Sequence, residues 1–163
     1  MAHNVKTHRL SAVLAAALVA FAGSAFAQDI KFGFNADQSG TAAAELGMAA
    51  RHGFELAIED INKAGGLLGK KVIPIVRDDT GTPPKSIQNM SDLIDNEKVV
   101  AVFGPTNSGN ALAWRHIPNQ KKIVSMGMIG SGTDITKPMS PGADNYMFRV
   151  SMVDREQVAG LAV

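Results

Sequence analysis

The chain has 163 residues, with 16 Lys and Arg against 15 Asp and Glu, and it contains no cysteine. Such a balanced charge provides no strong field for polyanions, so the composition gives little support for nucleic-acid binding. The lack of cysteine excludes disulfides and Cys-containing metal sites.

The first 27 residues have the three parts of a secretory signal peptide. Lys6 and Arg9 form a short basic region, residues 10–22 are apolar, and small residues flank a cleavage site after Ala27. The apolar run is shorter than the about 20 residues that a membrane span needs, which disfavours the alternative of an uncleaved anchor. We therefore predict an exported protein, with a signal peptide over residues 1–27.

Short apolar runs then alternate with helical patterns along the chain. Apolar runs predict strands at residues 30–34, 72–76, 99–103 and 123–126, with a further extended run at 146–150. Apolar residues at helical spacing predict helices at residues 42–64, 85–95 and 108–119, and another helix is expected to begin near residue 154. This alternation predicts a doubly wound parallel α/β sheet with right-handed crossovers.

Two local signals add detail to this fold. Gly65 and Gly66 are expected to end the first helix, because glycine accepts left-handed backbone angles. Pro74 has no N–H to donate, so the strand that contains it is expected at or near the edge of the sheet.

Ligands of such sheets bind beyond the carboxyl ends of the strands. The loop Gly104-Pro-Thr-Asn-Ser-Gly-Asn110 is the most informative one, because it joins a buried strand to a predicted helix. Backbone N–H groups and the Ser108 hydroxyl converge there, which indicates an anion site. The Lys-Ser/Thr pair of a nucleotide-binding P-loop is missing, so a small carboxylate is the better prediction.

Other residues have alternative interpretations. Ser108 could serve only as a helix cap, and capping of the next turn explains Asp78 and Asp79 better than catalysis or metal binding does. His52 and His116 fall on different predicted helices, so we predict no zinc site. Trp114 is interpreted as a packing residue, and no dinucleotide motif or catalytic triad is present.

Several motifs resemble the amino-terminal half of the branched-chain amino acid solute-binding proteins of ABC transporters. The motifs are Ser39-Gly40, Gly47, Gly53-Phe-Glu-Leu-Ala-Ile-Glu-Asp-Ile-Asn-Lys-Ala-Gly-Gly66 with Gly69, Asp78-Asp79, residues 104–108 and Thr133-Asp-Ile-Thr136. The resemblance implies a type I periplasmic binding fold, in which two hinged lobes close on a small ligand and present it to a membrane permease. Residues 28–148 would belong to an incomplete first lobe, and residues 149–163 to the hinge crossing and the start of the second.

The resemblance also assigns roles to residues. Ser108, between Asn107 and Gly109, would bind a ligand carboxylate through its hydroxyl and amide. In the next loop, Ser131 would accept from a ligand ammonium group, unless it serves only the turn, and Ile129 would offer its carbonyl, with Gly130 between them. Leu46 stands near the position where many relatives have an aromatic residue, so the ligand could be a branched-chain or other aliphatic acid, an amide or an aromatic acid.

The resemblance therefore implies a binding protein and not an enzyme. We expect a monomer that needs neither a cofactor nor a metal and that interacts with a membrane permease. The ligand-sensing ectodomain of a receptor shares the fold and remains an alternative.

Overall fold

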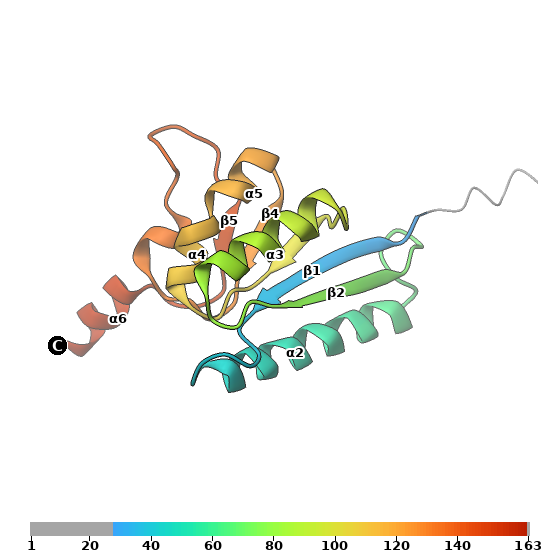
Figure 1. The fold of residues 1–163 in the computed structure, drawn as a ribbon, viewed down its shortest axis with the longest axis horizontal. Helices are drawn as coiled ribbons and strands as arrows, with labels where there is room; N and C mark the ends of the chain where they lie inside the picture. The colour runs from blue at the N-terminus through green and yellow to red at the C-terminus, as the bar shows by residue number, and fades with distance from the viewer. Residues whose placement is uncertain (1–27, 163) are drawn as a thin grey trace, which may run out of the picture.

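Five parallel strands of the described residues, 28–162, form one sheet in the computed structural model (Figure 1). Their order across the sheet is β2-β1-β3-β4-β5. The strands are β1 (Ile30–Ala36), β2 (Val72–Asp78), β3 (Ala101–Phe103), β4 (Val124–Gly127) and β5 (Met147–Arg149). The helices are α2 (Ala44–Lys63), α3 (Pro83–Asp95), α4 (Ser108–Trp114), α5 (His116–Lys121), α6 (Asp154–Leu161) and the 3-10 helix η1 (Thr133–Thr136).

Helices pack on both faces of the sheet, which confirms the predicted doubly wound α/β class. Helix α2 lies on one face, while α3, α4 and α5 lie on the other (Figure 1). Each face has its own apolar core: Phe34 of β1 packs with Phe54 and Ile58 of α2, whereas Leu93 of α3 and Trp114 of α4 belong to the opposite core. Burial of these side chains from water is the main force that joins the layers.

The predicted strands are confirmed, with small shifts in their bounds. Among the residues that the structure describes, strand β2 lies at the edge of the sheet and pairs with β1 alone, as expected from Pro74, which is aligned with Phe32. Strand β3 is central, but it begins at Ala101 rather than at Val99. Helix α2 is followed by Gly65 and Gly66, both with positive φ, as expected for its end.

The prediction of one helix over residues 108–119 is wrong. Helix α4 ends at Trp114, and the separate helix α5 begins at His116. Pro118 explains the interruption, because it cannot donate to the Trp114 carbonyl and its ring would clash there. The Arg115 carbonyl accepts instead from the side chain of Asn119 at 2.7 Å.

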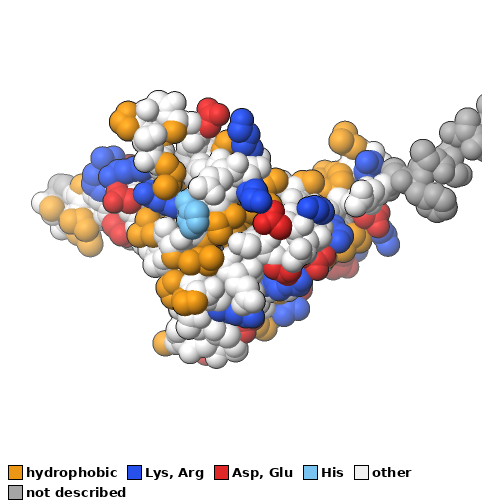
Figure 2. All heavy atoms as spheres, turned by 45° about the horizontal axis from the view of Figure 1, so that its top comes forward, with side chains coloured by type: hydrophobic (Ala, Val, Ile, Leu, Met, Phe, Trp, Pro, Cys, Tyr) orange, Lys and Arg blue, Asp and Glu red, His pale blue; other side chains and the backbone are white. Residues whose placement is uncertain are grey.

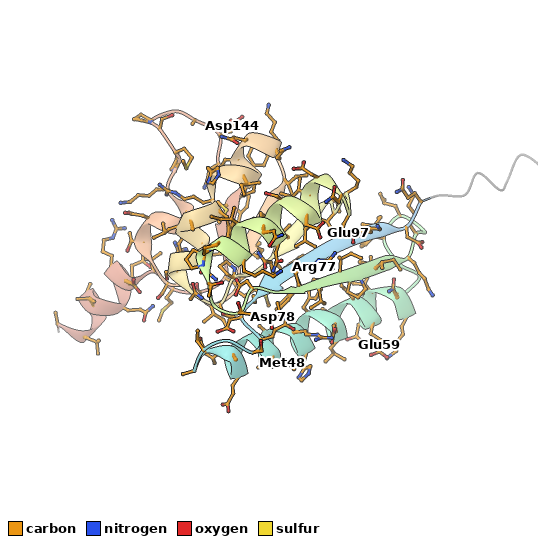
Figure 3. All side chains as sticks on the ribbon, in the orientation of Figure 1. Met48, Glu59, Arg77, Asp78, Glu97 and Asp144 are labelled. Carbon is orange, nitrogen blue, oxygen red and sulfur yellow. The ribbon has the colours of Figure 1, made fainter. Side chains whose placement is uncertain are left out.

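Charged side chains of both signs are interspersed on the face shown in Figure 2. A cluster of ion pairs also joins β1, β2 and α3. Arg77 contacts Glu97 at 2.9 Å (Figure 3). Arg77 also contacts Asp92 at 2.9 Å, and Lys31 contacts Glu97 at 3.0 Å. Hydrogen bonds from Lys31 and Arg77 lower the pKa of Glu97. The cluster is partly exposed, so it contributes modestly to stability.

The predicted signal peptide, residues 1–27, lies outside the described residues. Within residues 28–162, no helix is both long enough and apolar enough to cross a membrane. The proposed division between two lobes near residue 148 stays a prediction.

Candidate functional site

The loops after β3 and β4 meet at Ser108, where the carboxyl ends of the parallel strands lie. Ser108 is the first residue of α4, and its hydroxyl oxygen accepts a hydrogen bond from the amide of Gly132 at 3.0 Å. Packing is close here, because a Cβ on Gly132 would lie 3.0 Å from the Ser108 Cβ, and one on Gly130 would lie 3.4 Å from the Ser108 nitrogen. The structure thus places the predicted residues Asn107, Ser108, Gly130 and Ser131 in one region.

Asn107, and not Ser108, is the cap of α4. The Asn107 side-chain oxygen accepts from the amide of Asn110 at 2.8 Å, and its backbone is extended as a capping residue requires. The interpretation of Ser108 as only a helix cap is therefore wrong. A hydroxyl can donate one hydrogen bond and accept two, so the Ser108 hydroxyl can still donate while it accepts from Gly132.

Further donors surround the Ser108 hydroxyl. The first amides of a helix have no intrahelical acceptor, which leaves the N–H groups of Ser108 and Gly109 without such a partner. Gly109 is exposed and Ser108 is half-buried, so both can be reached from outside. The Thr106 hydroxyl in the same loop is buried and has no hydrogen-bond partner among the described residues. The Ser108 hydroxyl and the amides of Ser108 and Gly109 can donate to a carboxylate, whereas the Thr106 hydroxyl is shielded from molecules outside the protein.

A buried polar network fixes α4 against the rest of the lobe. Asp79, at the end of β2, accepts from the Asn110 side chain at 2.8 Å and from the Ser86 hydroxyl at 2.7 Å. The same Ser86 oxygen accepts from the Trp114 indole at 3.0 Å, while the Ser86 carbonyl accepts from Asn35 at 2.9 Å. All five residues are essentially buried, so each bond is shielded from water. The network therefore holds the Ser108 loop in a fixed position.

The loop after β4 contains the other predicted ligand residues. Ile129 and Ser131 are half-buried, and Gly130 is buried. The Gly130 carbonyl accepts from the Ser151 hydroxyl at 2.9 Å, and the Ser131 carbonyl accepts from the Asp154 amide at 3.0 Å. The Ile129 carbonyl accepts no hydrogen bond within residues 28–162, so it is available for a ligand. The proposed ligand contacts of Ile129 and Ser131 stay predictions.

Leu46, the last of the predicted ligand residues, lies outside both apolar cores. It is in the first turn of α2, its side chain is 53% exposed, and neither apolar core of the described residues includes it. The next residue, Gly47, packs closely on the preceding loop, where a Cβ would lie 1.6 Å from the Asp37 carbonyl oxygen. A role for Leu46 as an apolar wall for a ligand therefore stays a prediction.

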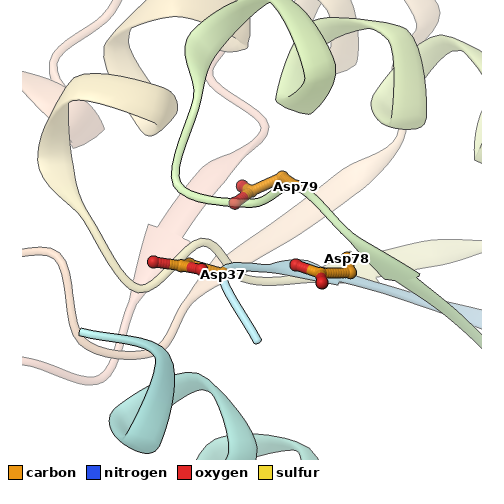
Figure 4. Close-up of side chains that lie close together, drawn as sticks. All are labelled: Asp37, Asp78 and Asp79. Atoms are coloured by element: carbon orange, nitrogen blue, oxygen red, sulfur yellow. The ribbon is translucent and has the colours of Figure 1, made fainter. Parts of the chain in front are cut away.

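Three aspartates lie close together where β1 and β2 end, with carboxylate oxygens within 4.8 Å of one another (Figure 4). Asp37 accepts from the amides of Ser39 and Gly40, and Asp78 accepts from the amides of Gln38 and Thr80. Asp79 accepts from the amide of Gly81 at 2.9 Å, as its predicted turn-capping role requires. The carboxylates already hold the loops together, so their arrangement is accounted for without a metal ion.

The hydrogen bonds change the acidity of two of these groups. Burial opposes ionisation of Asp37, but hydrogen bonds from Thr41, Gly40 and Ser39 outweigh it and lower the pKa of the carboxyl. For Asp78, burial is likewise outweighed by hydrogen bonds from Ser39, Thr80 and Gln38, and its pKa is also lowered. Both carboxylates are therefore stabilised in their charged forms by the turns that they hold.

The remaining residues considered from the sequence are Trp114, His52 and His116. Trp114 is fully buried, which confirms its predicted packing role. His52 lies on α2 and His116 on α5, on opposite faces of the sheet. Sequence reasoning did not identify Asn110, Ser86 or Arg149, whose contacts form only when distant segments meet.

The chain matches the family of periplasmic binding proteins over residues 29–163, and it belongs to that family. It is 31% identical over 153 residues to Leu/Ile/Val-binding protein homolog 3 of Brucella melitensis, an alignment that covers 94% of this chain and 40% of the relative. The resemblance stated from the motifs is thus confirmed at the level of the family.

Two solved structures support the same fold. One is the branched-chain amino acid transporter substrate binding protein LivJ from Streptococcus pneumoniae in complex with isoleucine, with a TM-score of 0.71 and 30% identity. The other is a solute binding protein of an ABC transporter from Rhodopseudomonas palustris in complex with 3,4-dihydroxy benzoic acid, with a TM-score of 0.66 and 28% identity. The matches cover 78% and 77% of this chain, but only 35% and 32% of those proteins.

Proposed function

We propose that this chain is part of the solute-binding component of an ABC transporter, and that it binds a small carboxylate such as a branched-chain amino acid. The observation that carries the proposal is the hydrogen bonding of the Ser108 hydroxyl. Its oxygen accepts from the Gly132 amide, which leaves the hydroxyl hydrogen free to be donated. The neighbouring amides of Ser108 and Gly109 add donors for the same negative group.

The ligand class is supported by the similar proteins and by the site. The relative from Brucella melitensis is named as a Leu/Ile/Val-binding protein, and the structure from Streptococcus pneumoniae holds isoleucine. The structure from Rhodopseudomonas palustris holds an aromatic acid. Both ligands have a carboxylate, and the donors around Ser108 fit that group whatever apolar part the ligand carries.

The further parts of the proposal follow from the family. We expect binding without turnover, because the similar proteins are named for binding and transport. A permease partner, a periplasmic location and a monomeric state are expectations of the same origin. Since the chain spans less than half the length of these similar proteins, the activity of the whole protein is part of the proposal.

Calorimetric titration of the complete mature protein tests the ligand class. L-leucine, L-isoleucine and 3,4-dihydroxybenzoate are the probes, and L-leucinamide is the control that lacks the carboxylate. We expect saturable binding of at least one of the acids, weaker binding of the amide, and unchanged ligand after prolonged incubation. Equal affinity for leucine and leucinamide, or conversion of the ligand, would contradict the proposal.

A further inference from the structure

Arg149, at the end of β5, contacts the loop that follows β4. Its guanidinium donates to the Ser131 carbonyl at 3.0 Å, to the Gly132 carbonyl at 2.7 Å and to the Thr136 hydroxyl at 3.2 Å. None of the ion pairs found within residues 28–162 involves Arg149. The side chain therefore binds two backbone carbonyls of the loop and a hydroxyl of η1 instead of an acidic partner.

The same loop has two more bonds to the segment that follows Arg149. The Ser151 hydroxyl donates to the Gly130 carbonyl at 2.9 Å, and the Asp154 amide donates to the Ser131 carbonyl at 3.0 Å. Three successive carbonyls, those of residues 130–132, are thus held by residues 149–154. The loop cannot rotate its peptide groups unless this segment also moves.

Gly132 contacts both Arg149 and Ser108. Its carbonyl accepts from Arg149, while its amide donates to the Ser108 hydroxyl at 3.0 Å. One residue therefore separates the arginine from the predicted carboxylate site. The Gly132 amide also shares one rigid peptide plane with the Ser131 carbonyl, which accepts from Arg149 at 3.0 Å, so a shift of either contact changes the orientation of the other.

We propose that Arg149 is a positioning residue that couples the ligand loop, residues 129–132, to the crossing segment, residues 149–154. The inference rests on the proposed function, since it takes Ser108 and Ser131 as ligand contacts. A ligand bound at these contacts restrains the loop, and the carbonyl bonds of Arg149 and Ser151 transmit the restraint to the crossing segment. The predicted hinge thereby responds to occupancy of the site.

The chemistry of the side chain fits this role. A guanidinium is a planar fork that binds two acceptors at once, whereas a lysine ammonium is a point charge on a flexible stem. Arg149 uses the fork to hold adjacent carbonyls in fixed directions. Arg149→Lys keeps the charge but loses this geometry, so it separates a positioning role from a purely electrostatic one.

Hydrogen exchange on the complete mature protein tests the coupling without a ligand. In Arg149→Gln, we expect the Gly132 amide, which donates to the Ser108 hydroxyl, to exchange about tenfold faster than in the unsubstituted protein, with Arg149→Lys in between. Arg155→Gln, on the exposed surface of α6, is the matched control and should leave this exchange unchanged. Unchanged exchange in Arg149→Gln would overturn the proposal. If that variant does not fold, Ser151→Ala tests the second link and should show the same direction of change.

Addition of a saturating acid identified by titration tests the transmission step. In the unsubstituted protein, the ligand should protect both residues 129–132 and residues 149–154. In Arg149→Gln, the loop should be protected while protection of the crossing segment is lost. A merely structural role would lower the melting temperature and leave both protections intact, which would overturn the coupling. If no carboxylate binds the unsubstituted protein, the proposed function fails, whereas the experiment without ligand still decides the role of Arg149.

Discussion

The hydroxyl oxygen of Ser108 accepts a hydrogen bond from the amide of Gly132, a residue 24 positions further along the chain. This bond joins the loop after β3 to the loop after β4 at the edge where the strands end. Because the oxygen is used as an acceptor, the hydroxyl hydrogen is directed away from Gly132 and can meet a ligand carboxylate. The candidate site is thus assembled by the contact of two loops and not by one motif.

Removal of a donor from the buried network beneath α4 should make the protein less stable. Asn110→Ala deletes the donor that contacts Asp79 at 2.8 Å and leaves that carboxylate less well satisfied in a dry environment. We expect the free energy of unfolding to fall by about 1–3 kcal/mol. Urea unfolding measures the change, and the matched control is Asn96→Ala, which removes a hydrogen bond of the same length to Asp92 at an exposed position. Equal stability of the two variants would show that the network does not fix α4.

Replacement by alanine should change the stability of the protein in opposite directions at two of its glycines. Gly104 has a φ of +119°, and a Cβ there would lie 2.0 Å from the Asn35 carbonyl oxygen. Gly104→Ala should therefore lower the free energy of unfolding by at least about 3 kcal/mol. Gly53→Ala, in α2, meets no atom within 4 Å and should raise it by about 0.5–1 kcal/mol. Urea unfolding of both variants checks the pair, and a tolerated Gly104→Ala would refute the close approach of the loop to β1.

The lowered pKa of Asp37 predicts a dependence of stability on acidity. The native pKa lies below the ordinary value of 3.8, so the unfolded chain holds this proton more tightly than the native protein does. The stabilisation is complete above the unfolded-state pKa and is lost as the pH falls through the lower native pKa. The difference in unfolding free energy between the unsubstituted protein and Asp37→Asn should therefore shrink as the pH falls below about 4.

Urea unfolding over a series of acidic pH values tests this dependence. Asp144→Asn removes an acidic side chain at an exposed position and is the control for the change in net charge. A difference between Asp37→Asn and the unsubstituted protein that stays constant down to about pH 2 would show that Asp37 gains nothing from its turn in the native state.

The sequence predicted the scaffold well because its signals are local. Pro74 indicated an edge strand, and alternating apolar runs indicated a parallel sheet, both of which the structure confirms. Helix α3 begins at Pro83, two residues before the predicted start at residue 85, because proline fits the first turn of a helix. Pro118 has the opposite effect inside a helical pattern, and it separates α4 from α5.

The candidate site could be predicted only in part. The prediction of an anion site at the Ser108 loop rests on residues adjacent in sequence, but the contact of Ser108 with Gly132 depends on how β3 and β4 pair. Arg149 lies further along the chain, and no local pattern relates it to the loop that it binds. Contacts of this kind are set by the packing of the sheet, so sequence spacing alone does not reveal them.

The affinity of Ser108→Ala for a carboxylate ligand tests the central claim most directly. In the complete mature protein, calorimetric titration with the acid that binds the unsubstituted protein should show a loss of about 1–3 kcal/mol in binding free energy, because a charged acceptor loses a donor. Ser140→Ala, at an exposed position in the loop before β5, is the matched control and should bind as the unsubstituted protein does. Unchanged affinity in Ser108→Ala would contradict the claim that this hydroxyl binds the negative end of the ligand.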